Sequence, residues 1–89
     1  MDDYKILGHL EVLAERLEIT VSYEPLEIDG SYHSGGFCRI KGKDIVIINK
    51  KSSVTDKIII LVDTLKRYDL SQIYILPSIR AMLHLEEDH

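Results

Sequence analysis

Cysteine, aromatic residues and long apolar runs are scarce in this sequence. Its 89 residues include one cysteine, one phenylalanine, two prolines and no tryptophan. A single cysteine excludes an intramolecular disulfide bond. No apolar run approaches the roughly 20 residues that a membrane-spanning helix requires, and the acidic start lacks the basic and apolar segments of a signal peptide. We therefore expect a cytoplasmic protein that does not interact with a membrane.

Recognisable catalytic and metal-binding motifs are also missing from the sequence. A zinc site needs three or four ligands at suitable spacing. His33, Cys38 and Asp63 are the conceivable ligands, but no Cys-x-x-Cys or His-x-x-x-His spacing accompanies them. The sequence therefore predicts no metal and no cofactor, and it favours a protein that is not an enzyme.

Acidic residues outnumber basic ones, 15 to 11, which gives a net charge of −4. This argues against nonspecific nucleic-acid binding, which depends on cationic contacts to phosphate. The charge is uneven, because residues 39–57 contain six basic and two acidic side chains, a local sum of +4. Such a region can attract an acidic partner. Alternatively, its lysines only prevent strand edges from pairing with other chains.

The chain has the length of one domain, residues 1–89, with an ordinary apolar content of 45% and charged content of 29%. Apolar residues spaced by three and four predict helices, and alternating ones predict strands. The expected elements are a helix over 3–18, a strand over 19–23, a loop over 25–36, strands over 37–41 and 45–48, a helix over 54–68 and a helix from Pro77. This order, α-β-β-β-α-α, predicts an α+β fold with a small, mostly antiparallel three-stranded sheet covered by helices.

The two central strands form a predicted β-hairpin around which the rest of the chain is arranged. Residues 45–48 are all β-branched, and such residues pack well on a pleated sheet. Glycine at the first central position suits a tight turn, so we place the turn at Gly42 and Lys43. Cys38 and Ile40 share one face of the first strand, which predicts a buried, inert cysteine.

The apolar residues exceed what so short a chain is expected to bury by itself. The strand over 45–48 is apolar on both faces, so it is either buried on both sides or uses one side as a contact. Ile59 and Ile60 also fall outside the predicted buried stripe of their helix. The leading hypothesis is therefore a non-catalytic protein-interaction or regulatory module. We predict a homodimer, with an unknown protein partner as the alternative, and an interface that contains Val46, Ile48, Ile59 and Ile60.

The segment from His33 to Arg39 is the strongest candidate for a ligand site. Gly35 and Gly36 can form an anion-binding nest of backbone N–H groups, or they can serve the backbone where the strand begins. His33 precedes Cys38 by five residues, and a histidine can activate a thiol nucleophile. The alternative function is therefore a small enzyme or an anion- or ligand-binding protein that uses this segment.

Asp63 is unexpected in the apolar helix over 54–68. It lies at the margin of the predicted buried face, where a carboxylate needs a partner. Arg67, four residues later on the same helix, is well placed for an ion pair, and Arg39 is the other choice. We include Asp63 and Arg67 among the candidate ligand-binding residues and keep a purely structural ion pair as the alternative.

The strand over 45–48 ends at Asn49 and is followed by two serines and the helix over 54–68. In this part, residues 36–70, the chain resembles the core of ImmA/IrrE-type zinc peptidase-like domains, in which the helix carries His-Glu-x-x-His. On that alignment the two histidines and the glutamate fall on Asp63, Arg67 and Thr64. The resemblance therefore implies a relative without zinc. The chain is also similar to small bacterial proteins with a Gly-Gly-x-Cys-Arg hairpin, and this similarity implies no function.

Overall fold

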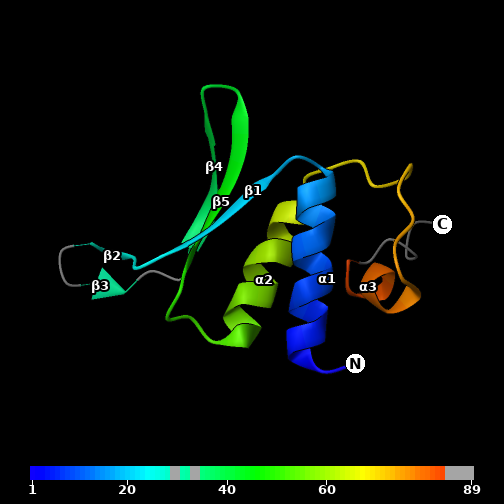
Figure 1. Cartoon of the computed structure of the whole chain (residues 1–89), viewed down its shortest axis with the longest axis horizontal. Helices are drawn as coiled ribbons and strands as arrows, with labels where there is room; N and C mark the ends of the chain where they lie inside the picture. Colours follow the sequence, from blue (N-terminus) through cyan, green and yellow to red (C-terminus); the bar gives the residue numbers. More distant parts are fainter. Residues whose placement is uncertain (29–30, 33–34, 84–89) are drawn as a thin grey trace.

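The computed structural model describes residues 1–28, 31–32 and 35–83, with the backbone alone described at 27, 28, 31 and 32. Figure 1 shows the arrangement of the helices and strands. In chain order they are α1 (Asp3–Arg16), β1 (Thr20–Glu24), β2 (Glu27–Ile28), β3 (Ser31–Tyr32), β4 (Gly35–Ile40), β5 (Lys43–Asn49), α2 (Val54–Leu65) and α3 (Pro77–Met82). In these parts of the chain, no helix has both the length and the apolar character needed to cross a membrane.

Three strands make the main sheet, in the order β1-β5-β4, with β5 in the centre. Strand β4 runs antiparallel to β5, whereas β1 runs parallel to it. Helices α1 and α2 lie on one side of this sheet, and α3 packs on the far side of α1 (Figure 1). The predicted α+β fold and element order are confirmed. The predicted loop over 25–36 contains an additional short antiparallel ribbon, β2 and β3.

Side chains cap the first two helices. The Asp2 carboxylate accepts a hydrogen bond from the Lys5 backbone N–H at 2.9 Å, and the Ser53 hydroxyl accepts one from the Asp56 N–H at 3.1 Å. Such bonds satisfy N–H groups that have no partner within the helix. Helix α1 ends earlier than predicted, because Glu18 adopts a positive φ of 62° that no α-helix accommodates.

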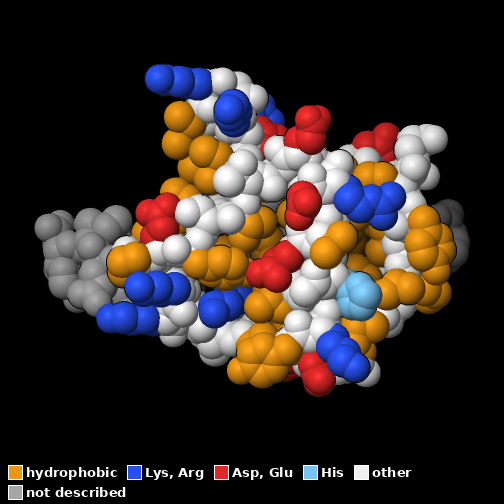
Figure 2. All heavy atoms as spheres, viewed as in Figure 1, with side chains coloured by type: hydrophobic (Ala, Val, Ile, Leu, Met, Phe, Trp, Pro, Cys, Tyr) orange, Lys and Arg blue, Asp and Glu red, His pale blue; other side chains and the backbone are white. Residues whose placement is uncertain are grey.

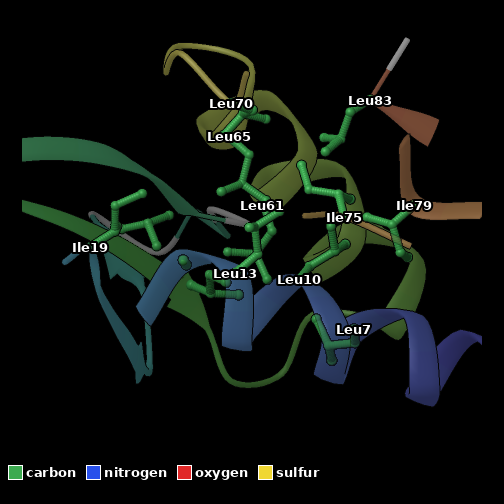
Figure 3. Packing of buried hydrophobic residues seen from close by; sticks show 13 residues of the cluster. Leu7, Leu10, Leu13, Ile19, Leu61, Leu65, Leu70, Ile75, Ile79 and Leu83 are labelled. Atoms are coloured by element: carbon green, nitrogen blue, oxygen red, sulfur yellow. The ribbon is translucent and has the colours of Figure 1, made fainter. Parts of the chain in front are cut away.

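The core fills the space between the sheet and the helices and continues toward α3. Leu10, Leu61 and Leu65 are fully buried where α1 and α2 meet. Figure 3 shows these side chains converging with those of the C-terminal segment. The segment contributes four buried residues, namely Leu70, Ile75, Ile79 and Leu83. The helices are therefore fixed on both sides, by the sheet and by the segment after α2.

Asn49 is fully buried and holds the chain where it crosses the end of β5. Its amide nitrogen donates to the Leu26 carbonyl at 3.3 Å, and its side-chain oxygen accepts from the Lys51 N–H at 3.0 Å. The Lys50 N–H donates to the Glu24 carbonyl at 3.0 Å. These bonds join Glu24, at the end of β1, and Leu26, just after it, to the end of β5. The two bonds of the Asn49 side chain also offset the free-energy cost of removing its amide from water.

The hairpin turn lies one residue earlier than predicted. Its two central residues are Lys41 and Gly42, with φ values of 52° and 79°, and Ile40 pairs with Lys43. Positive φ at both positions is the type I′ geometry that suits tight hairpins. Our placement of the turn at Gly42 and Lys43 was wrong. The observed register brings Arg39 opposite Asp44, and these two side chains form an ion pair that stabilises it.

Val46 and Ile48 face the helices and not a second copy of the chain. Both side chains are completely buried within the single chain. They therefore do not form an interface, contrary to the prediction. Because side chains alternate along a strand, Ile45 and Ile47 point to the other side of the sheet, where both are only half-buried.

Candidate functional site

The β4–β5 hairpin extends past the start of β1 and presents two different surfaces. We call the side that α1 and α2 cover the covered face, and the opposite side the open face. Paired residues share a face, so the register assigns Phe37, Arg39, Asp44 and Val46 to the covered face. The same register assigns Cys38, Ile40, Ile45 and Ile47 to the open face.

An ion pair and a tyrosine fix the outer part of the covered face. The Arg39 Nε donates to the Asp44 carboxylate at 2.5 Å, and the Tyr68 hydroxyl donates to the other oxygen of the same carboxylate. The hydrogen bonds from Arg39 and from Tyr68 lower the pKa of Asp44. Burial, together with the bond to Asp44, raises the pKa of Tyr68 to about 12. Tyr68 thereby joins the hairpin to the end of α2.

Aromatic contacts continue this cluster toward Arg67. The Phe37 and Tyr68 rings meet edge to face, with centroids 6.4 Å apart and planes at 77°. The Arg67 guanidinium lies over the Phe37 ring, 5.1 Å from its centroid. Edge-to-face and cation–π contacts of this geometry are favourable. Arg39 and Arg67, both predicted as ligand-binding residues, are therefore brought to one cluster.

The open face of the sheet is apolar in its middle and charged at its ends. Ile40 is 50% exposed, and Cys38, Ile45 and Ile47 are half-buried. Among the described residues, no helix lies against this side (Figure 1). Cys38, which we expected to be buried, belongs to this surface and carries a free thiol.

Further residues complete the open face at its two ends. Ser22 and Glu24 of β1 lie at one end, where the Ser22 hydroxyl donates to the Glu24 carboxylate at 2.7 Å. Lys43 lies at the other end, beside the turn. The face therefore has an acidic end and a basic end, with the apolar residues between them.

An acidic groove of about 830 Å³ separates α1 from the hairpin tip. Glu11, Glu15 and Glu18 line one side of it, and Lys43 lines the other. Figure 2 shows acidic side chains over α1 and basic side chains at the tip of the hairpin. The Tyr23 hydroxyl donates to Glu11. Burial, and to a smaller extent this hydrogen bond, raise the pKa of Tyr23. Within this groove Glu11 is hydrogen-bonded to Tyr23, and Asp44 is paired with Arg39.

The predicted ligand site over His33–Arg39 is described only from Gly35 onward. His33 lies outside the described residues. Cys38 and Arg39 point to opposite faces of the sheet, so they cannot hold one small ligand between them. Gly35 and Gly36 are paired strand residues, and a Cβ on Gly35 would lie 2.3 Å from the Ile47 carbonyl oxygen. The glycine at 35 is therefore required by the backbone.

The remaining candidates on α2 differ in their exposure. Asp63 is exposed and forms no ion pair with Arg67, because Arg67 lies on Phe37. The structural pair that we offered as an alternative is therefore not formed. Ile59 is 56% exposed, whereas Ile60 is half-buried and packs against the core.

Sequence reasoning missed Phe37, Asp44 and Tyr68, which support the two arginines. The signal that was available is the spacing of Arg39 and Asp44 on either side of a tight turn. Opposite charges at such positions form cross-strand pairs. Tyr68 carried no comparable signal, because it lies beyond the end of the helix and meets the hairpin only in the folded chain.

Across the described part of the chain, no group of three or more His, Cys, Asp or Glu side chains is arranged to hold a metal ion. Comparison with models of protein families found no match, and comparisons with curated proteins and with solved structures found none either. The resemblance to zinc peptidase-like domains therefore stays a prediction. Function has to be argued from the surfaces of this chain alone.

Proposed function

We propose that this protein is a non-catalytic interaction module that self-associates through the open face of its sheet. The observation that carries the proposal is the row of apolar side chains on that face, Cys38, Ile40, Ile45 and Ile47. Sheets in small domains normally bury one face and place polar residues on the other. Here the second face is apolar on two neighbouring strands, which is typical of a contact surface.

A second copy of the chain is the partner that the charges favour. Glu24 lies at one end of the open face and Lys43 at the other. A two-fold axis perpendicular to the strands would place Glu24 of one copy over Lys43 of the other, twice in each dimer. The opposite orientation would place like charges together, so electrostatics selects one geometry.

The size of the open face sets the expected affinity. Three strands spaced by about 4.8 Å, with seven residues rising about 3.3 Å each, give a face of roughly 14 by 23 Å. This is less than half of the roughly 800 Å² that each partner contributes to a standard interface. We therefore expect weak association, with a dimer that forms at about 100 µM and above.

Sedimentation velocity from 10 to 1000 µM tests the proposal with two matched variants. Ile40 on the open face and Ile59 on α2 are exposed to similar extents, 50% and 56%. We expect Ile40→Glu to abolish the concentration-dependent dimer and Ile59→Glu to leave it unchanged. A wild-type chain that stays monomeric at 1000 µM, or a dimer lost only in Ile59→Glu, would overturn the proposal.

A further inference from the structure

We propose that Arg39 and Arg67 form a clamp that binds the carboxylates of an acidic peptide segment in a partner protein. The arginine clamp consists of these two residues and their supports Phe37, Asp44 and Tyr68. It lies on the covered side of the hairpin, beyond the helices. The open face of the sheet is on the other side, so the clamp does not depend on self-association.

Arg67 is held in place by stacking while its hydrogen-bond donors remain available. Its guanidinium lies 5.1 Å from the centroid of Phe37. Within the described residues, the Arg67 side chain makes no hydrogen bond or ion pair with another residue, and Arg67 is exposed. A guanidinium stacked by its face keeps its N–H groups at its edge, where they match the two oxygens of a carboxylate.

Arg39 is positioned by a different contact and also retains donors. Its Nε donates to Asp44, and the side chain is 64% exposed. The Tyr68 hydroxyl also interacts with this guanidinium. A guanidinium has five N–H donors, more than these two partners occupy, so donors remain for a further acceptor. Tyr68 occupies the second oxygen of Asp44 and so keeps the carboxylate from rotating to take more of the guanidinium.

A continuous series of contacts links the two arginines. Arg67 lies on Phe37, Phe37 meets the edge of Tyr68, Tyr68 donates to Asp44, and Asp44 accepts from Arg39. Both guanidinium groups are thus ordered before a ligand arrives, which reduces the entropy lost on binding. Two arginines and one carboxylate leave a charge of +1, and Lys41 and Lys43 at the tip add to the attraction.

Charge around the clamp favours a short acidic peptide over a nucleic acid. The acidic groove containing Glu11, Glu15 and Glu18 lies next to the hairpin tip, and the whole chain carries −4. An extended phosphate polymer that follows the hairpin would meet these like charges. A few carboxylates on a peptide contact the clamp alone, and each forms a charge-assisted pair with a guanidinium.

Titration with an acetylated peptide of six glutamates, followed by 1H–15N NMR at low salt, tests this inference. We expect the largest shifts at the Nε–H signals of Arg39 and Arg67. Arg39→Gln and Arg67→Gln should each weaken binding about tenfold, as for the loss of one charge-assisted pair. Arg67→Lys should weaken it nearly as much, because the ammonium keeps the charge but not the planar fork.

Control variants separate the clamp from general electrostatics. Arg16→Gln on α1 removes the same charge from another exposed site, and Lys66→Gln removes a charge beside Arg67. Neither should change the affinity by more than about twofold. Equal weakening by these controls, or no binding of the peptide, would overturn the clamp. Tighter binding of a six-residue thymidine oligonucleotide would overturn the choice of an acidic peptide.

The same titration on Ile40→Glu distinguishes the clamp from the proposed dimer. That variant alters only the open face, so it should bind the glutamate peptide as the wild type does. If the wild-type chain binds the peptide but never dimerises, this inference stands and the proposed function fails.

Discussion

Replacing Gly35 by alanine should destabilise the protein far more than replacing its neighbour Gly36. Gly35 begins β4 with a φ of 137°, a conformation that L-residues rarely adopt. A Cβ at this position would lie 2.3 Å from the Ile47 carbonyl oxygen and 2.9 Å from the Ile48 Cα. Both contacts are with the backbone of the central strand, so no side chain can move aside to relieve them.

The magnitude follows from two contributions. A non-glycine residue in a sparsely populated backbone region costs about 1–3 kcal/mol, and forcing an extra methyl group against fixed atoms costs about 1–3 kcal/mol more. We expect Gly35→Ala to lower the free energy of unfolding by roughly 2–6 kcal/mol. This is a large part of the roughly 5–15 kcal/mol that stabilises a typical domain. No heavy atom lies within 4 Å of a Cβ built on Gly36, so Gly36→Ala should change stability by less than about 1 kcal/mol.

Urea unfolding followed by circular dichroism measures both free energies, and calorimetry gives the thermal midpoints. For a domain of this size, 1 kcal/mol corresponds to about 4–8 °C, so Gly35→Ala should lower the midpoint by at least about 8 °C. A loss below about 1 kcal/mol for Gly35→Ala would refute the reasoning. Equal losses in the two variants would also refute it, because the glycines would then share a role that the backbone geometry does not explain.

Two further predictions concern Asn49 and Tyr68. Asn49→Ala should lower the free energy of unfolding by about 3 kcal/mol, because it removes the two hydrogen bonds that this buried amide makes to the Leu26 carbonyl and from the Lys51 N–H. Chemical denaturation measures this, and a loss under about 1 kcal/mol contradicts it. The pKa of Tyr68 in the folded protein is raised to about 12. Between about pH 10 and pH 12 the tyrosine therefore loses its proton in the unfolded chain but keeps it in the folded one. The free energy of unfolding should fall as the pH rises through this range. Tyr68→Phe should make this alkaline decline shallower, and an unchanged pH dependence of the thermal midpoint contradicts the assignment.

Local sequence patterns predicted the helices and the strands of the main sheet. The stripe on α1, the hydroxyl of Ser53 and the β-branched run in β5 act over a few residues, so they are visible without the fold. The ribbon of β2 and β3 was missed, since each strand has only two residues and no alternation can be recognised over that length. Asn49 binds Leu26, the residue directly before this ribbon.

The side of the sheet that the helices cover was not predictable from β5 alone, because both of its sides are apolar. We assigned Val46 and Ile48 to a contact surface, whereas both lie on the side that the helices cover. Arg39 shares that side of the hairpin. Arg39 pairs with Asp44, beyond the start of β1 opposite Ile45, so its charge lies outside the region that the helices cover. Polar residues at the tip of a protruding hairpin therefore do not show which face of the sheet is buried at its base.

Competition between two hairpin registers decides both the turn and the arginine clamp. The turn that we predicted at Gly42 and Lys43 requires positive φ only at glycine, so it avoids strain, but it places Arg39 opposite the fully buried Val46. The observed register gives Lys41 a positive φ, which costs about 1–2 kcal/mol. It places Arg39 opposite Asp44 instead, and this avoids the several kcal/mol needed to bury an unpaired charge. The strained turn is therefore the smaller of the two costs. Only this register connects Arg39 through Asp44 to Tyr68. The difference between these two costs therefore determines both the position of the turn and the order of the residues that would bind an acidic partner.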